Sequence, residues 1–578
     1  MEVLLSCFSA LSRQRQKDWK EIEEKVKTIE DQASWTSPHE NTCMFEAFEW
    51  YVPQDGRHYQ RLQQCLPDLR EIGIDNLLLP PGCKAMHPSG NGYDIYDLYD
   101  LGEFDQKGTV ATKWGSKKDL VALGQAAQDL GMGVYWDAVL NHKAGADRTE
   151  RCLAVTVDPK DRNIDLTKPQ EIEAWVGFDF SARGDTYSKQ KYGWQHFNGT
   201  DCNDLDKTKS AIYKIFAPGK DWARDVSTSE NGNYDYLMFA NLDHSNPEVR
   251  NDIFNWTEWI GGQLPLKGMR LDAVKHYSAE FQKALVDHVR QTSKEWFFVS
   301  EYWSGNVLEI QDYLKLVEYK VHAFDAPLCQ RLSAISQSRG ADLRMVFEKT
   351  LVKFEPEHAV TFVMNHDTQP HQALEAPISS PFKPLAYALI LLRKDGYPCI
   401  FYGDLYGMCS STSSLKNGKP KKFRHPQVPK ELWTLPAMIL ARKLYAYGEQ
   451  QDYFLHRNYI GFVRYGNARH LWGMACVVNN GLTAVRLRMF VGKRHAGERW
   501  SDVLDLTQSS DEGAVKDKRV PETEKGAEKK KTKSIVRINA KGYAYFPVQS
   551  MSVGVWVNEA AEGRERFGTC FHSDIYSY

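Results

Sequence analysis

Apolar runs of strand length recur along the chain from about Cys43, and segments with helical spacing alternate with them. The strand candidates are residues 74–80, 133–140, 268–274, 297–301, 360–364 and 399–402, and the helix candidates are 117–130, 247–262, 279–296 and 383–393. Nearly continuous hydrophobicity is typical of parallel strands that are covered on both faces. Repeated βα units over this length predict an α/β fold, a (β/α)8 TIM barrel.

The same pattern divides the 578 residues into four parts. Residues 1–40 are polar and charged and are predicted to be an N-terminal extension, whereas residues 41–141 and 247–446 are predicted to form the barrel. Residues 142–246 are too many for a βα loop, so we expect them to form a small β-rich domain inserted over the barrel mouth. Short alternating strands follow in residues 447–578 and predict an antiparallel β domain, with a charged, disordered insertion at 508–534.

Charge and cysteine content narrow the classes of partner and the compartment. Lys and Arg number 73 against 75 Asp and Glu, a net charge of −2, which argues against nucleic acid or an anionic membrane as partner. The 11 cysteines include no C-x-x-C pair, which favours free thiols in a reducing compartment and predicts a cytoplasmic protein. Glu2 replaces the basic start of a signal peptide, and no apolar run is long enough to span a membrane.

Polar side chains that a core would not tolerate stand at the ends of four predicted strands. Carboxyl ends of barrel strands meet at one face, so we expect these side chains to converge there. They are Asp137 with Asn141 and His142, Arg270 with Asp272, Glu301, and His366 with Asp367. Four such segments together are hard to explain by structure alone and predict an active site.

Two carboxylates in this set have the surroundings that glycoside hydrolysis requires. Arg270 and Asp272 are two apart on a strand and point to one face, so their pairing is expected to lower the pKa of Asp272. Glu301 follows an apolar run and should lie near Asp272 and Asp367, so its pKa is expected to rise. An ionised nucleophile beside a protonated acid is the arrangement of a retaining glycosidase.

Four segments carry a resemblance to a known family. In chain order they are DAVLNH at 137–142, GMRLDAVKH at 268–276, SEYW at 300–303 and FVMNHD at 362–367. They resemble the four sequence regions of the α-amylase family, glycoside hydrolase family 13. The segments GYDIYDLYDLGEF at 92–104 and NHDTQP at 365–370 look like the branch of bacterial liquefying and fungal intracellular α-amylases. The resemblance spans about residues 43 to 560.

The resemblance implies a barrel with an inserted domain B, a C-terminal β domain and cleavage of internal α-1,4 bonds in starch- or glycogen-like glucans and maltooligosaccharides. It makes Asp272 the nucleophile, Glu301 the acid/base and Asp367 a third carboxylate that grips the sugar. The other implied sugar contacts are Tyr93, His142, Arg270 and His366 around the cleaved sugar, and Lys275 and His276 on the leaving-group side. Trp303 is either a sugar platform or a core residue.

The resemblance also implies a calcium site between the barrel and domain B. Its ligands would be Asn141, Asp235, Asn241 and the main-chain carbonyl of His276. Relatives usually carry Asp where this chain has Asn241, and bacterial relatives place further acids where it has Asn198 and Ser245. Calcium affinity depends on the number of carboxylate ligands, so we expect one weak calcium site or none, and no cofactor required for the chemistry.

Three other functions compete with hydrolysis. A 4-α-glucanotransferase of the same fold would make maltooligosaccharide primers for cell-wall α-glucan. A non-catalytic, amylase-like transporter subunit would lack the acids and carry a membrane span. A barrel lyase would use Asp272, Glu301 and Asp367 as magnesium ligands, with no need of Arg270. The sequence leaves the oligomeric state and the preferred glucan length open.

Overall fold

The computed structural model describes residues 41–208, 210–409, 430–505, 534–569 and 571–577. The predicted N-terminal extension and all but the last residue of the charged insertion at 508–534 lie outside these residues.

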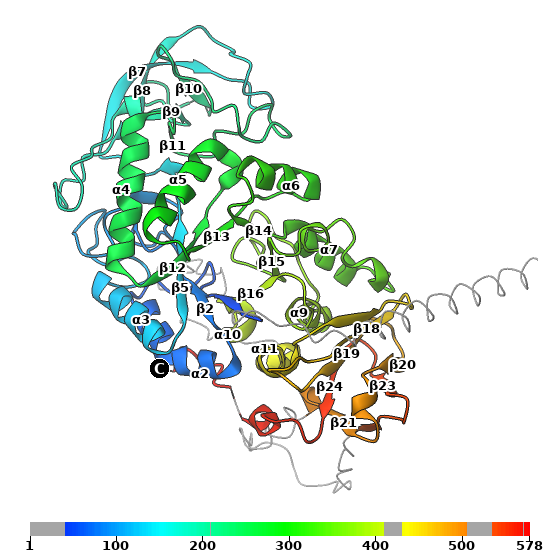
Figure 1. Cartoon of the computed structure of the whole chain (residues 1–578). Coiled ribbons are helices and arrows are strands. Elements are labelled where there is room, and N and C mark those ends of the chain that lie inside the picture. The colour runs from blue at the N-terminus through cyan, green and yellow to red at the C-terminus, as the bar shows by residue number, and fades with distance from the viewer. Residues whose placement is uncertain (1–40, 209, 410–429, 506–533, 570, 578) are drawn as a thin grey trace, which may run out of the picture.

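Eight parallel strands close into a barrel, which confirms the predicted fold (Figure 1). In order around the barrel they are β1 (Met44–Glu46), β2 (Asn76–Leu78), β5 (Gly133–Ala138), β12 (Leu266–Leu271), β13 (Phe297–Ser300), β14 (His322–Phe324), β15 (Ala359–Phe362) and β16 (Tyr397–Phe401). Six of them overlap the predicted strand segments. The other two, β1 and β14, lie outside those segments.

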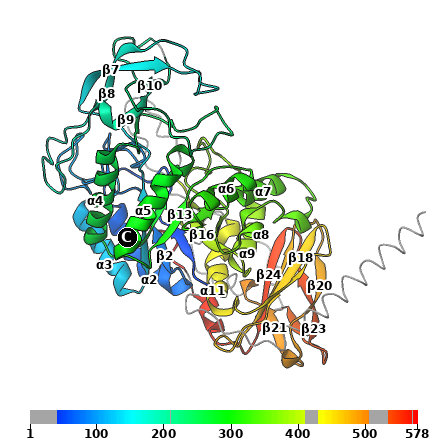
Figure 2. The same ribbon diagram turned by 45° about the horizontal axis from the view of Figure 1, so that its top comes forward.

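Helices alternate with the strands and lie around the outside of the barrel, as Figures 1 and 2 show. They are α2 (His58–Ile72), α3 (Lys117–Asp129), α4 (Pro247–Gln263), α5 (Ala279–Thr292), α6 (Val307–Leu316), α7 (Ala326–Gln337), α8 (Leu351–Phe354), α9 (Lys383–Leu391), α10 (Tyr402–Tyr406) and α11 (Leu435–Tyr445). Several begin at a side chain that accepts a hydrogen bond from the first turn, which fixes the loop before the helix. These caps are Ser116, Asn246, Ser278, Asn306 and Asp325.

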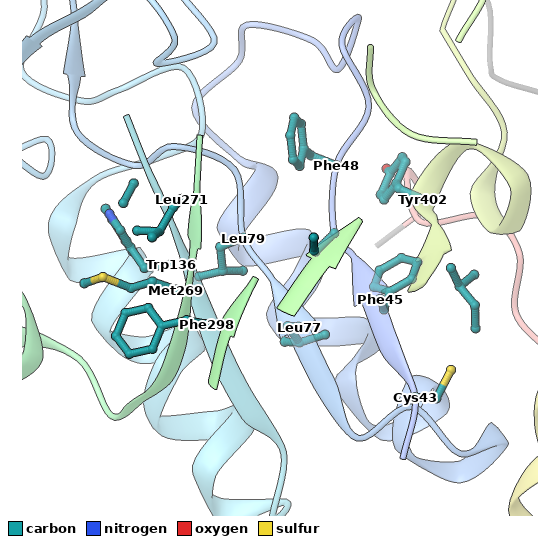
Figure 3. Close-up of a cluster of buried hydrophobic side chains, with 14 of the residues drawn as sticks. Cys43, Phe45, Phe48, Leu77, Leu79, Trp136, Met269, Leu271, Phe298 and Tyr402 are labelled. Atoms are coloured by element: carbon teal, nitrogen blue, oxygen red, sulfur yellow. The ribbon is translucent and has the colours of Figure 1, made fainter. Parts of the chain in front are cut away.

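Alternate residues of the barrel strands enter two different apolar clusters. One cluster lies between strands and helices and is drawn in part in Figure 3; it includes Phe45, Leu77, Trp136, Met269, Leu271 and Phe298. The other fills the barrel interior and includes Met44, Leu78, Tyr135, Val299 and Val360. Residues two apart on a strand point to the same side. Two residues after Met44, Tyr135 and Val299 of the interior cluster, at the carboxyl ends of their strands, come Glu46, Asp137 and Glu301. The strand pleat therefore turns acids into the barrel mouth.

The chain between β5 and α4 forms a six-stranded antiparallel sheet at the top of Figure 1. Its order is β6 (His142–Lys143), β11 (Ala240–Leu242), β9 (Phe197–Thr200), β10 (Tyr213–Ile215), β7 (Arg148–Thr156) and β8 (Gln170–Gly177). The first and last strands of the insert, β6 and β11, pair with each other directly beyond the end of β5. That pairing holds the insert at the carboxyl end of β5.

A second group of antiparallel strands follows α11. One sheet has the order β17 (Gln450–Tyr453), β18 (Tyr459–Arg464), β19 (Met474–Asn479), β24 (Ser552–Asn558), β21 (Arg499–Asp502) and β22 (Ile535–Arg537). The other pairs β20 (Val485–Phe490) with β23 (Tyr543–Val548), and side chains of both sheets share an apolar cluster. The last residues leave β24 and return to the barrel, where Ile575 is fully buried.

Replacing Phe298 by alanine tests the packing between strands and helices. Phe298 is fully buried, so we expect Phe298→Ala to lower the free energy of unfolding by about 3–5 kcal/mol. Leu482→Ala is the control, because Leu482 is 82% exposed and its loss should change stability by less than about 0.5 kcal/mol. Urea unfolding of the three proteins measures both values, and a Phe298→Ala loss no larger than the control contradicts this packing.

Candidate active site

The guanidinium of Arg270 lies at the centre of the barrel mouth and binds three carboxylates. One terminal nitrogen donates to Asp137 Oδ1 at 2.5 Å and to Asp272 Oδ1 at 2.8 Å, and the other donates to Glu301 Oε2 at 2.9 Å. The backbone amide of Ala273 also donates to Glu301 Oε2, at 3.0 Å. Asp137, Arg270 and Glu301 come from the adjacent strand ends of β5, β12 and β13, so strand register brings these groups together.

Burial sets the proton affinity of this cluster. It raises the pKa of Glu301, as the sequence predicted, against the opposing charge of Arg270. Burial also raises the pKa of Asp272, and the charges of Glu301 and Asp137 add to it. Arg270 does act to lower the pKa of Asp272, as predicted, but the expected net lowering is wrong because one guanidinium is shared among three desolvated carboxylates and burial outweighs it. Asp272 and Glu301 consequently titrate as a pair.

Asp367 and His366 form a charged pair beside this cluster. The ring of His366 is buried between two carboxylates, with Nδ1 at 2.7 Å from Glu46 Oε1 and Nε2 at 3.1 Å from Asp367 Oδ2. Burial opposes the charge on His366, but both carboxylates outweigh it and raise its pKa to about 10. Burial also favours protonation of Asp367, but His366 and Arg270 outweigh it and lower the pKa of Asp367. His366 is thus a cation and Asp367 an anion at neutral pH.

Tyr93 and His142 form a wall next to both the Arg270 cluster and His366. The Tyr93 hydroxyl donates to Asp137 Oδ2 at 2.8 Å, and the ring stacks on His366 and on Trp50, with centroids 5.0 and 5.8 Å apart. His142 Nε2 lies 2.8 Å from the Tyr93 carbonyl. Burial lowers the pKa of His142 to about 4, so the neutral ring donates to that carbonyl. The wall therefore presents aromatic rings beside the carboxylates.

Lys275, His276 and Trp303 lie on another side of the site. The Lys275 ammonium pairs with Glu230 of the inserted segment and donates to the Trp303 carbonyl at 3.2 Å. Lys275 also lines a cavity of about 190 Å³. His276 Nδ1 lies 3.0 Å from the Tyr234 carbonyl, and burial lowers its pKa to about 3. The Trp303 ring packs against the interior cluster.

The predicted calcium ligands Asn141, Asp235 and Asn241 are buried where the insert joins the barrel. Asp235 accepts hydrogen bonds from Asn198 Nδ2 at 2.6 Å and from Asn241 Nδ2 at 3.4 Å, and burial raises its pKa to about 7. The side-chain oxygens of Asn141 and Asn241 are buried with no hydrogen-bond partner. One carboxylate with the orphaned amide oxygen of neighbouring Asn241, and a second orphaned amide oxygen on Asn141, are a donor set that fits a hard cation weakly.

Comparison with known proteins decides the family. The family model "Alpha amylase, catalytic domain" matches residues 58–431. The chain belongs to the α-amylase family. Glucan 1,4-α-maltohexaosidase of Bacillus sp. strain 707 is 41% identical over 522 residues, which cover 90% of this chain and 93% of that protein. The cytoplasmic α-amylase of Escherichia coli K12 is 39% identical over 473 residues, 81% and 94% of the two chains.

A solved structure agrees on the fold of this α-amylase family member. The Geobacillus thermoleovorans α-amylase complexed with acarbose superposes with a TM-score of 0.56 at 17% identity, covering 90% of this chain and 98% of that one. The family model and the relatives confirm the resemblance found in the sequence motifs, and the same motifs supply most of the residues that meet at the barrel mouth.

Sequence reasoning passed over two residues of this α-amylase site, Glu46 and Trp50. Both belong to the segment that contains β1, where two acids interrupt an otherwise apolar run from Cys43 to Val52. An acid within an apolar strand segment indicates a candidate site residue, because a buried charge requires a partner. Its partner His366 lies 320 residues away, so the contact could not be predicted from local sequence.

The charge of His366 predicts how stability depends on pH. The pKa of about 10 in the folded state exceeds the ~6.5 of an unperturbed histidine, so protonation stabilises the fold. This contribution is complete below pH ~6.5 and is lost as the pH rises through about 10. We therefore expect wild type to exceed His366→Gln in melting temperature by more at pH 6 than at pH 10. His87→Gln, at an exposed histidine, is the control. A difference independent of pH contradicts a cationic His366.

Proposed function

We propose that the protein is a retaining α-amylase that cleaves internal α-1,4-glucosidic bonds of starch- or glycogen-like glucans and maltooligosaccharides. The observation that carries the proposal is the binding of Asp272 and Glu301 to the two terminal nitrogens of one buried guanidinium. This arrangement brings two carboxyls close together at the mouth of a barrel, as a retaining glycosidase requires. The α-amylase names of relatives that cover most of both chains support the substrate class.

In this mechanism Asp272 attacks the anomeric carbon while Glu301 protonates the glycosidic oxygen. The leaving chain departs, a glycosyl ester forms on Asp272, and Glu301 then removes a proton from the water that hydrolyses the ester. The mechanism requires the proton that burial holds on the pair to start on Glu301; the negative charge of Asp367 raises the pKa of both acids and favours retention of that proton by the pair. Asp367, kept anionic by His366, is placed to bind hydroxyls of the distorted sugar. Tyr93 offers the sugar an aromatic face.

The same proposal places the enzyme in the cytoplasm. All nine cysteines of the described residues are free thiols, which suits a reducing compartment. The E. coli relative is named a cytoplasmic α-amylase. Within the described part of the chain, no helix has the length and hydrophobicity needed to cross a membrane.

We further propose one weak calcium site formed by the side chains of Asn141, Asp235 and Asn241 and the main-chain carbonyl of His276. A bound calcium would supply positive charge to Asp235 and ligate the two unpartnered amide oxygens. Its role would be to tie the insert to the barrel, since none of these three side chains contacts the reacting carboxyls in the network around Arg270.

Substitution of the two acids tests the chemistry. Asp272→Asn and Glu301→Gln each remove one chemical step, so we expect kcat on maltoheptaose to fall by at least about 10³-fold. The control is Asp312→Asn, whose side chain is 71% exposed, and it should retain wild-type turnover. Retention of more than a few per cent of activity by purified Asp272→Asn contradicts the assigned role.

The stereochemistry of the product tests retention separately. Because the mechanism inverts the anomeric carbon twice, NMR of a fresh digest should show α-anomers before mutarotation. Early β-anomers would refute the nucleophilic role of Asp272. Chromatography of a concentrated maltopentaose digest tests the 4-α-glucanotransferase alternative, which produces chains longer than the substrate.

Removal of calcium tests the metal proposal. Stabilisation by a ligand depends on RT ln(1+[L]/Kd), so EDTA should lower the melting temperature by only a few degrees, about 1 kcal/mol or less. Asn241→Asp adds a carboxylate to the site and should enlarge the effect of EDTA. The control is Asn203→Asp in the same insert, away from these ligands. An Asn241→Asp protein that responds to EDTA no more than this control contradicts the site.

A further inference from the structure

Residues Phe571–Tyr576, next to the end of the described chain, cover part of the barrel rather than the C-terminal sheets. We call them the C-terminal segment. The ring of Phe571 lies 5.7 Å from that of Tyr406, and Ile575 is fully buried in the main core. The guanidinium of Arg61, on α2, lies 4.9 Å from the centroid of the Tyr576 ring. Figure 1 shows the C-terminus beside α2.

Tyr576 contacts α10 and the loop that follows it. Its hydroxyl lies 3.4 Å from Cys409 Sγ and 3.4 Å from the Tyr402 hydroxyl. The backbone amide of Cys409 donates to Glu49 Oε1 at 3.1 Å. The side chain of Glu49 is fully buried, and its other oxygen accepts from the Tyr51 amide at 2.8 Å and from Gln369 Nε2 at 3.0 Å. The C-terminal segment thus lies against a loop that satisfies a buried acid.

The same network ends at Trp50 in the active site. Gln369 Oε1 accepts from the backbone amide of Trp50 at 3.0 Å. The Trp50 carbonyl accepts from Asn91 Nδ2 at 3.2 Å and from the Lys113 ammonium at 3.0 Å, so the backbone of Trp50 is held on both sides. Its ring is nearly parallel to those of Tyr93 and His366, with interplanar angles of 4° and 7°.

A displacement of Cys409 would therefore change the position of Trp50 in the substrate site. Loss of the Cys409 amide leaves an oxygen of Glu49 unsatisfied, and an unsatisfied buried carboxylate is costly, so Glu49 and its partner Gln369 would move. Trp50 would then lose its place against Tyr93. The reacting acids take their position from Arg270, which is a separate set of contacts.

We propose that the C-terminal segment is a positioning element for substrate binding, and that Tyr576 acts through Cys409, Glu49 and Gln369 on Trp50. The proposal rests on the active site assigned above. Because Trp50 supports the rings that face the sugar rather than the groups that react, a fault in this network should weaken substrate binding more than turnover.

Steady-state kinetics on maltoheptaose test the proposal. We expect Tyr576→Ala to raise KM about fivefold while kcat changes less than about twofold. Tyr576→Phe keeps the ring on Arg61 but removes the hydroxyl that contacts Cys409 and Tyr402, so it should raise KM by less than Tyr576→Ala. Ser573→Ala, at an exposed position of the same segment, is the matched control. If Tyr576→Ala does not fold, Tyr576→Leu replaces it with the same expectation, since leucine fills much of the space but removes the ring.

Two further variants separate positioning from general destabilisation. Val477→Ala creates a cavity in the C-terminal sheet, and a KM equal to wild type is expected despite a lower melting temperature. Glu49→Gln should raise KM by itself, and adding Tyr576→Ala should raise it little more, because both act on one network.

Three results would overturn the proposal: a wild-type KM in Tyr576→Ala, full additivity with Glu49→Gln, or an equal rise of KM in Val477→Ala. A wild-type enzyme that does not cleave maltoheptaose would instead refute the proposed function, so the two failures are distinguishable.

Discussion

The buried guanidinium of Arg270 is the interaction on which the active site depends. It gathers acids from three strand segments at distances of 2.5 to 2.9 Å, in a place where an unpaired carboxylate would be expelled or protonated. A planar fork of donors can serve several carboxylates at once, which a lysine ammonium on a flexible stem would do less rigidly. The barrel supplies the strand register, and Arg270 converts that register into a fixed spacing between Asp272 and Glu301.

The three histidines of the site differ in charge because their surroundings differ. His366 lies between two carboxylates and keeps its proton, whereas His142 and His276 face backbone carbonyls and stay neutral. The same side chain can thus fix an anion at one wall and donate a neutral hydrogen bond at another. This division gives Asp367 a cationic partner in His366, while His142 and His276 add no charge to the site.

Much of this site could be predicted from sequence, because polar residues at the ends of apolar strands are a local signal. Asp272, Glu301, Asp367 and Arg270 all carry that signal, and the barrel follows from the repeated βα pattern. Two kinds of feature could not be predicted. The first is contact between distant segments, such as Glu46 with His366. The second is the net effect of several charges on one group. The raised pKa of Asp272 depends on how many buried acids share the single guanidinium of Arg270.

Closure of the barrel between β1 and β16 has a consequence for biosynthesis. The first strand pairs with the last, and Glu46 meets His366 across 320 residues of chain. During synthesis, β1 therefore keeps an unpaired edge until β16 has emerged from the ribosome. The apolar side chains of β1 are exposed to chaperones during that interval, and a truncated chain has no means of assembling the wall that carries His366.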